Sequence, residues 1–186
     1  MRIDIEPNET FLKAASFVIH TDRPIFLTGK AGTGKTTFLK YIQKNCPKKL
    51  AIAAPTGVAA INAGGTTLHS LFHLPFGTYL KDYALRWDES DNNVYNRHRL
   101  LSKIKFSVEK RNLIQELDLL IIDEVSMLRA DMLDAIDDIL KSVRRDMRPF
   151  WGFTGFIYWR LISTPTGSQT FGMDIDAKRL SKPVFL

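Results

Sequence analysis

The chain has 186 residues, of which 45% are hydrophobic and 25% charged, and its formal net charge is +6. This is the composition of one globular domain, and it excludes a disordered, collagen-like or disulfide-rich chain. With one cysteine, Cys46, and neither a signal peptide nor a bilayer-long apolar run, we expect an intracellular protein without membrane contact, cytoplasmic or, in a eukaryote, nuclear.

The first third of the chain alternates helical and strand-like segments. Apolar residues at helical spacing predict a helix over Glu9–His20, and the run Pro24–Leu27 predicts a short buried strand. A glycine-rich turn then leads into a helix over about Lys35–Asn45. A second buried strand, Leu50–Ala54, is followed by a helix over Val58–Asn62.

The second half contains one irregular stretch and one clear strand–helix pair. Between residues 76 and 112 the pattern loosens, which predicts an inserted subdomain or a long loop. The apolar strand Asp118–Ile122 ends in Asp123 and Glu124, and Ser126 can cap the next helix. Alternating strands and helices predict an α/β fold with a parallel sheet. The apolar stripe of the last helix is Leu128, Met132, Leu133, Ile136, Ile139 and Leu140.

A phosphate-binding loop is predicted between the first strand and the second helix. Residues 29–36 match G-x-x-x-x-G-K-[ST] in the required strand–loop–helix setting. The glycines let backbone N–H groups surround phosphate oxygens, while Lys35 would neutralise the β- and γ-phosphates and Thr36 would ligate Mg²⁺. A glycine-rich turn before an ordinary helix is the alternative. The expected ATP-binding residues are Gly29, Ala31, Gly32, Thr33, Gly34, Lys35, Thr36 and Thr37.

Two consecutive carboxylates give an independent sign of nucleotide chemistry. Asp123 follows an apolar strand, so its carboxylate lies at the carboxyl edge of the sheet beside the loop, where it would hold Mg²⁺ through water. Glu124 would orient or activate the attacking water. We therefore expect Lys35, Asp123 and Glu124 to be catalytic, and Thr36 and Asp123 to be metal ligands. A solvated strand end is the alternative.

Three segments, Ala54–Asn62, Gly64–Phe72 and Leu119–Met127, resemble the Pif-type DNA helicases. These are superfamily-one enzymes related to RecD that move 5′-to-3′ along single strands. The resemblance covers nearly everything from residue 24 to residue 150. It implies an ATP-dependent DNA helicase that uses ATP and Mg²⁺, with a RecA-like motor domain over residues 1–150 in which the stretch between residues 76 and 112 is the family's inserted wedge.

The resemblance also implies that the chain is a monomer that binds single-stranded DNA. Aromatic and polar side chains suit base stacking and phosphate contact. Taken singly, His69 or Phe72 could equally be a core residue. The implied DNA contacts are Pro55, Thr56, Gly57, His69, Ser70 and Phe72.

From Trp151 onward the resemblance stops, and the family's Gly-Asp-x-x-Gln motif, second RecA-like domain and arginine finger are not found in the sequence. One back-translation of residues 151–168, read one nucleotide later, gives GGLQVLFIGDLFQLPPV, which contains that motif and the strand before it. The first base of each shifted codon is fixed by the second base of a printed codon, so a match this long is not expected by chance. We expect residues 151–186 to be frame-shifted translation after an insertion near the codon of Phe150.

The tail bears on whether the sheet is complete. In the family fold, the strand carrying the missing motif lies between the phosphate-loop strand and the Asp123 strand, so its loss would leave both unpaired on one side. The apolar, β-prone run Phe156–Trp159 could partly occupy that gap. The leading hypothesis is the N-terminal ATPase domain of a truncated helicase, incomplete at its C-terminal end. The alternatives are a stand-alone P-loop ATPase or nucleotide kinase, and an inactive nucleic-acid-binding fragment.

Overall fold

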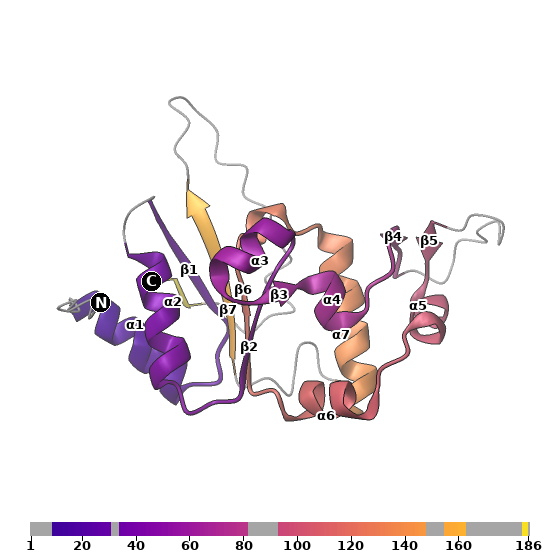
Figure 1. Ribbon diagram of the computed structural model, residues 1–186, viewed down its shortest axis with the longest axis horizontal. Helices are drawn as coiled ribbons and strands as arrows, with labels where there is room; N and C mark the ends of the chain where they lie inside the picture. The colour runs from indigo at the N-terminus through magenta and orange to yellow at the C-terminus, as the bar shows by residue number, and fades with distance from the viewer. Residues whose placement is uncertain (1–8, 31–33, 82–92, 148–154, 163–183, 186) are drawn as a thin grey trace.

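The computed structural model describes residues 9–30, 34–81, 93–147, 155–162 and 184–185. In this part of the chain a six-stranded parallel sheet has the order β3-β2-β6-β7-β1-β8 (Figure 1). The α/β fold with a parallel sheet is therefore confirmed. The strands are β1 Ile25–Lys30, β2 Leu50–Ala54, β3 Thr66–Thr67, β6 Leu119–Ile122, β7 Gly155–Ile162 and β8 Val184–Phe185.

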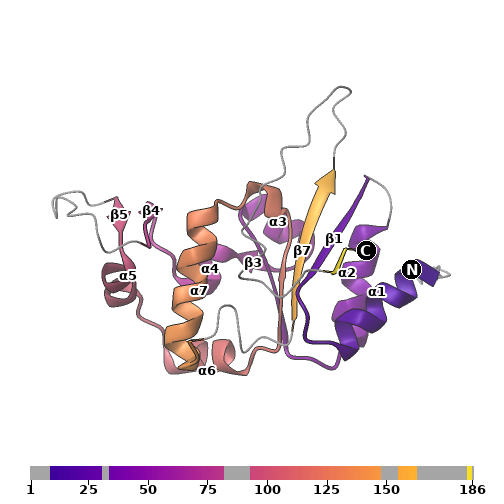
Figure 2. The same ribbon diagram turned by 180° about the vertical axis from the view of Figure 1, so that it is seen from behind.

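Helices pack against both faces of the sheet, as Figures 1 and 2 show from opposite sides. Leu119 and Ile121 of β6 pack with α1 and α2, whereas Leu120 and Ile122 pack with α7 on the opposite face. Side chains alternate across a strand, so a strand that is covered on both faces is apolar throughout. The helices are α1 Glu9–His20, α2 Lys35–Asn45, α3 Gly57–Ala63, α4 Leu68–Phe72, α5 Arg97–Lys103, α6 Val108–Glu116 and α7 Ala130–Arg144.

No helix among the described residues combines the length and the apolar character that a membrane crossing requires.

Strand β7 lies between β1 and β6. Ile25–Lys30 pairs with Ile157–Ile162 on one side, and Leu119–Ile122 pairs with Gly155–Tyr158 on the other. The prediction that the apolar run in the tail occupies the gap is confirmed. The facing edges of β1 and β6 are paired along their whole length, so their backbone groups are not left exposed in the middle of the sheet.

The helix after Glu124 begins later than the sequence predicts, and the prediction that Ser126 caps it is wrong. Ser126 lies inside η1, a 3₁₀ turn over Val125–Met127, and α7 begins at Ala130. Leu128 is extended and only 7% exposed. Burial of this leucine draws the chain away from the turn before α7 starts, which separates Ser126 from the helix.

The irregular stretch between residues 76 and 112 contains regular structure. Its described part includes β4 (Thr78–Tyr79) and β5 (Val94–Tyr95), which pair in parallel, and then α5. Helix α6 runs through the expected boundary at residue 112 and ends at Glu116. Helices α5 and α6 and strand β4 all pack against α7. The stretch therefore forms a small unit seated on that helix.

Acidic residues of α7 hold this unit in place. Asp131 accepts a hydrogen bond from the backbone N–H of Tyr79 at 3.0 Å. Asp138 accepts one from the Tyr79 hydroxyl and lies 3.5 Å from Nε of Arg97. Asp138 is 4% exposed, and a buried carboxylate is stable only where charge and hydrogen bonds compensate its desolvation. These contacts fix the position of β4 relative to the sheet.

Candidate active site

The segments that the sequence singles out all leave the sheet at one edge. The phosphate loop follows β1, Asp123 follows β6, Pro55 follows β2, and α4 follows β3. The neighbouring strands pair in parallel, so these strand ends lie at the same, carboxyl edge of the sheet (Figure 1). In open parallel sheets this edge is where ligands bind.

Gly34 shapes the start of α2. It has φ 84° and ψ 13°, and its carbonyl accepts a hydrogen bond from the N–H of Phe38 at 2.9 Å. A side chain in this left-handed region is strained, which explains a glycine directly before Lys35. Gly29 is the fifth residue of β1 and lies opposite Leu161. The predicted ligands Ala31, Gly32 and Thr33 lie outside the described residues.

Lys35 occupies the first position of α2, and its side chain is buried, with 8% exposed. Thr36 is exposed and Thr37 is half-buried, so the helix start presents a buried cation beside an accessible hydroxyl. Lysine is almost never fully buried unless it is paired with opposite charge. The charge of Lys35 lowers the pKa of both Asp123 and Glu124, so the three groups are close enough to interact electrostatically.

Asp123 and Glu124 form a tight turn at the end of β6. The backbone N–H of Asp123 donates to the carbonyl of Ala53 at 2.9 Å, which keeps this residue in register with β2. Its Oδ1 accepts the backbone N–H of Glu124 at 2.8 Å. Glu124 has φ 54°, a left-handed conformation that costs a non-glycine residue about 1–3 kcal/mol. Strain of this kind is typical of functional sites.

The environment raises the pKa of both carboxyls. Burial raises the pKa of Asp123, and the Glu124 N–H and the Lys35 charge lower it by smaller amounts. Burial also raises the pKa of Glu124, and the neighbouring Asp123 charge adds to this effect, while Lys35 opposes it. A cluster of desolvated titratable groups around one cation is a frequent property of catalytic sites.

The predicted DNA contacts lie around α3 and α4. Thr56 caps α3, and its hydroxyl accepts the N–H of Ala59 at 3.3 Å. Pro55 is half-buried and Gly57 is exposed. At Gly57 an added Cβ would meet no atom within 4 Å, so the backbone there is open to a ligand.

In α4, the predicted contacts differ in exposure. Ser70 is exposed and His69 is half-buried, and α4 begins at the same edge of the sheet as α3. Phe72 has no exposed surface and packs in the core with residues of β6 and α7. The expectation that Phe72 lies against a DNA strand is therefore wrong, because its ring fills the interior below α4.

The exposed aromatic ring in this region is Phe76, which is not among the predicted DNA contacts. Phe76 is 83% exposed, and its ring stacks on that of His69 with centroids 5.0 Å apart and planes at 22°. The available signal was an aromatic residue directly before Gly77, at the point where the helical pattern ends. Helical periodicity favoured Phe72 instead.

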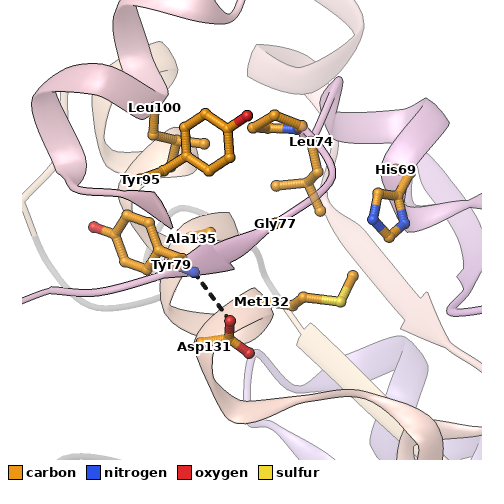
Figure 3. A pocket seen from close by; sticks show the side chains of 10 residues that line it. His69, Leu74, Gly77, Tyr79, Tyr95, Leu100, Asp131, Met132 and Ala135 are labelled. Atoms are coloured by element: carbon orange, nitrogen blue, oxygen red, sulfur yellow. Dashed lines mark hydrogen bonds between the residues drawn. The ribbon is translucent and has the colours of Figure 1, made fainter. Parts of the chain in front are cut away.

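A small cavity lies next to this ring pair, between α4, β4, β5 and α7 (Figure 3). Its volume is about 20 Å³, enough for one water molecule but not for a nucleotide. His69 lies at one side of the cavity, and the Tyr79–Asp131 hydrogen bond closes another. A larger hollow, about 670 Å³, lies between α6 and the amino-terminal half of β2, away from the phosphate loop.

Comparison with known proteins gives consistent matches. A family profile described as PIF1-like helicase matches residues 5–157. The ATP-dependent DNA helicase PIF1 of Candida albicans is 38% identical over 132 residues, which are 69% of this chain and 13% of that protein. This chain therefore spans only a small part of such a relative.

Solved structures agree with the sequence matches. The crystal structure of Bacteroides Pif1 bound to ssDNA superposes with a TM-score of 0.68 and 40% identity, over 89% of this chain and 34% of that one. The structure of Bacteroides sp Pif1 in complex with ADP-AlF4 also has a TM-score of 0.68 and 40% identity, over 90% and 35%. The fold is therefore RecA-like.

Proposed function

The chain belongs to the PIF1-like helicase family, and on this basis we propose that it binds and hydrolyses ATP as part of a DNA helicase motor. The observation that carries the proposal is Lys35, which is buried at the start of α2 while its charge acts on both carboxylates after β6. Phosphoryl transfer requires a cation at the phosphates opposite a metal-binding acid. A Bacteroides relative in complex with ADP-AlF4 supports the assignment of the nucleotide site.

Each site residue has a defined role in hydrolysis. Lys35 neutralises the β- and γ-phosphates, and the backbone that turns at Gly34 directs the N–H groups of the helix start toward them. Glu124 accepts a hydrogen bond from the attacking water and orients it in line with the leaving phosphate. The raised pKa of Glu124 makes it a better proton acceptor than an ordinary exposed glutamate.

The donor set fits magnesium. Mg²⁺ keeps several waters and takes one or two protein oxygens, and here the Thr36 hydroxyl and the Asp123 carboxylate are available. Among the described residues no group of three or more His, Cys, Asp or Glu side chains could hold a metal alone, so a dedicated protein cage is absent there. When bound with ATP, Mg²⁺ neutralises charge on the phosphates. The Glu124 N–H orients the Asp123 carboxylate for this role.

We also propose that single-stranded DNA binds across α3 and α4. Pro55, Thr56 and Gly57 lie at one end of this surface, and His69 and Ser70 lie on α4. A Bacteroides relative bound to ssDNA supports this partner. We expect the chain to act as a monomer inside the cell, which light scattering of the purified chain would test.

ATP hydrolysis by the purified chain, with and without single-stranded DNA, tests the proposal. Lys35→Ala should lower turnover by about a hundredfold or more, because it removes the charge that faces the transferred phosphoryl group. Lys40→Ala is the matched control, since Lys40 lies on the same helix and is exposed. Stimulation by DNA supports a helicase motor. ATP turnover that depends on Lys35 but does not change when DNA is added supports a different P-loop ATPase. If turnover does not depend on Lys35, the result supports an inactive fragment.

We further propose that residues 1–150 are motor-domain sequence and that residues 151–186 are read in a shifted frame. Backbone pairing of β7 on both sides supports a tail that supplies a strand, but the side chains of Gly-Asp-x-x-Gln are not in its sequence. Sequencing the gene across the codon of Phe150 tests this proposal. Codons that cannot be read as GGLQVLFIGDLFQLPPV after a one-nucleotide shift would overturn it.

A further inference from the structure

Two stacked rings, here called the aromatic step, involve α4 and the segment that connects α4 to β4. The outer ring is Phe76, which is 83% exposed, and it stacks on the ring of the half-buried His69 with an angle of 22° between the two ring planes. Single exposed apolar residues are common on protein surfaces, so what distinguishes Phe76 is that its ring stacks on a histidine and is followed by a glycine at positive φ. Because 83% of Phe76 is exposed although it stacks on His69, most of its ring is accessible to a ligand.

The backbone holds this ring in a fixed position. Gly77 has φ 148°, and a Cβ there would lie 2.3 Å from the carbonyl oxygen of Asn93. Thr78 donates its N–H to that same carbonyl at 2.8 Å, and Tyr79 is tied to Asp131 of α7. The residues after Phe76 are therefore locked against β5 and α7. A preorganised ring loses little conformational freedom when a ligand binds.

We propose that the free face of Phe76 stacks on a nucleobase of single-stranded DNA, which makes the Phe76–His69 pair a base-binding step. The inference rests on the proposed function and adds to it a contact that reads the base rather than the phosphate. Aromatic rings bind successive bases of single strands by stacking, largely independently of sequence, because every base has a π face.

The surroundings favour a base over a protein surface. Large exposed apolar patches mark contacts between proteins, whereas from residue 70 to residue 77 the exposed residues other than Phe76 are Ser70, His73 and Gly77. The exposed Val58 and Ile61 belong to a different helix, α3. The Phe76 ring, which stacks on His69, is about as wide as one nucleobase. His69 lies two residues after Thr67, whose strand partner Ala54 lies two residues before Thr56, so the base of the step and Thr56 leave neighbouring strand ends. The net charge of +6 favours a polyanion.

Binding of the full chain to labelled single-stranded oligothymidylate, followed by fluorescence anisotropy, tests the step. A second probe has the same backbone with abasic sites in place of the bases. Phe76→Ala should weaken binding to oligothymidylate about tenfold, the size expected for one stacked base, and should change binding to the abasic strand less than twofold. Phe76→Trp should bind oligothymidylate like the wild type, because it restores a ring.

Val108→Ala is the matched control, since Val108 is 71% exposed on α6 and should bind both probes like the wild type. Equal losses on the two probes, or no loss on either, would overturn the proposal. Lys35-dependent binding of a fluorescent ATP analogue to the wild type is measured in parallel. A chain that binds ATP but shows no base-dependent effect of Phe76 refutes the step and leaves the ATPase proposal standing.

Discussion

The hydroxyl of Tyr79 donates a hydrogen bond to the buried carboxylate of Asp138, and this contact ties β4 to the middle of α7. Helix α7 starts six residues after Glu124, and β4 starts two residues after Phe76. The same helix therefore adjoins the candidate hydrolytic residue at its start and anchors the segment that carries the exposed aromatic ring.

Tyr79→Phe should lower the free energy of unfolding by about 1–3 kcal/mol, because it removes the hydroxyl that donates to the buried Asp138 carboxylate and, among the described residues, leaves that carboxylate with Arg97 alone, at 3.5 Å. Urea unfolding followed by circular dichroism measures this. Tyr95→Phe is the matched control, since Tyr95 lies on the paired strand and the change keeps the ring that contacts Arg99 and Lys103. Equal effects of the two changes would contradict the role assigned to the Tyr79 hydroxyl.

Gly77→Ala should destabilise the small unit on α7 by about 1–3 kcal/mol, since the new Cβ meets the Asn93 carbonyl in a conformation strained for any side chain. Gly57→Ala provides the contrast. A Cβ at Gly57 meets nothing within 4 Å, and alanine is a better helix former, so the free energy of unfolding should stay the same or rise slightly. Thermal unfolding of both variants separates the two cases, and a stable Gly77→Ala protein would refute the steric argument.

Asp123→Asn should stabilise the fold at neutral pH while it abolishes hydrolysis. Burial raises the pKa of Asp123 above its ordinary value of 3.8, so the folded chain binds this proton more tightly than the unfolded chain. The free energy of unfolding therefore falls as pH rises from 3.8 through the folded pKa, and the loss persists at neutral pH. Asparagine cannot ionise, and its Oδ1 still accepts the Glu124 N–H.

Urea unfolding of the wild type and Asp123→Asn across this pH range measures the difference. The stability advantage of the variant should be present at neutral pH and should shrink as pH falls below the folded pKa. An Asp123→Asn protein that is less stable than the wild type at neutral pH would show that the carboxylate is stabilised in the fold, against the direction of its pKa shift.

Lys48→Met should destabilise the chain by about 1–3 kcal/mol, because its Nζ donates to the carbonyls of Val18 and Thr21 at the end of α1, at 3.0 and 2.7 Å. Its side chain is 12% exposed. The neighbouring Lys49 pairs with Glu116 at 2.8 Å, but both side chains are exposed and solvent screens the pair. Lys49→Met should therefore leave the urea midpoint near that of the wild type, and a larger effect at Lys49 would refute this ranking.

The proposed nucleotide-binding residues can be predicted from short sequence patterns. A glycine before Lys35 and two acids after an apolar strand are short patterns, and parallel pairing then brings the strand ends to one edge. The roles of Lys35, Asp123 and Glu124 stay predictions, but the structure places all three in one electrostatic environment.

Which aromatic residue of the proposed DNA surface is exposed depends on contacts between residues that are distant in sequence. Whether Phe72 or Phe76 faces solvent depends on α7 filling the space below α4, and no pattern within α4 reveals this. The partner of Asp138 is likewise 59 residues away, so the sequence shows only an acidic helix. Ser126 fails as a cap for the same reason, since a buried leucine further on decides where the helix begins.

The place of β7 bears on how the molecule folds. The phosphate loop follows β1 and Asp123 follows β6, and in the described sheet β7 lies between these two strands. Residues 155–162 leave the ribosome after all of those elements, and their partners in β1 lie far back in the sequence. Pairings at such sequence separation form slowly. We therefore expect the phosphate loop and Asp123 to reach their positions on either side of β7 only after this strand has paired with both of its neighbours.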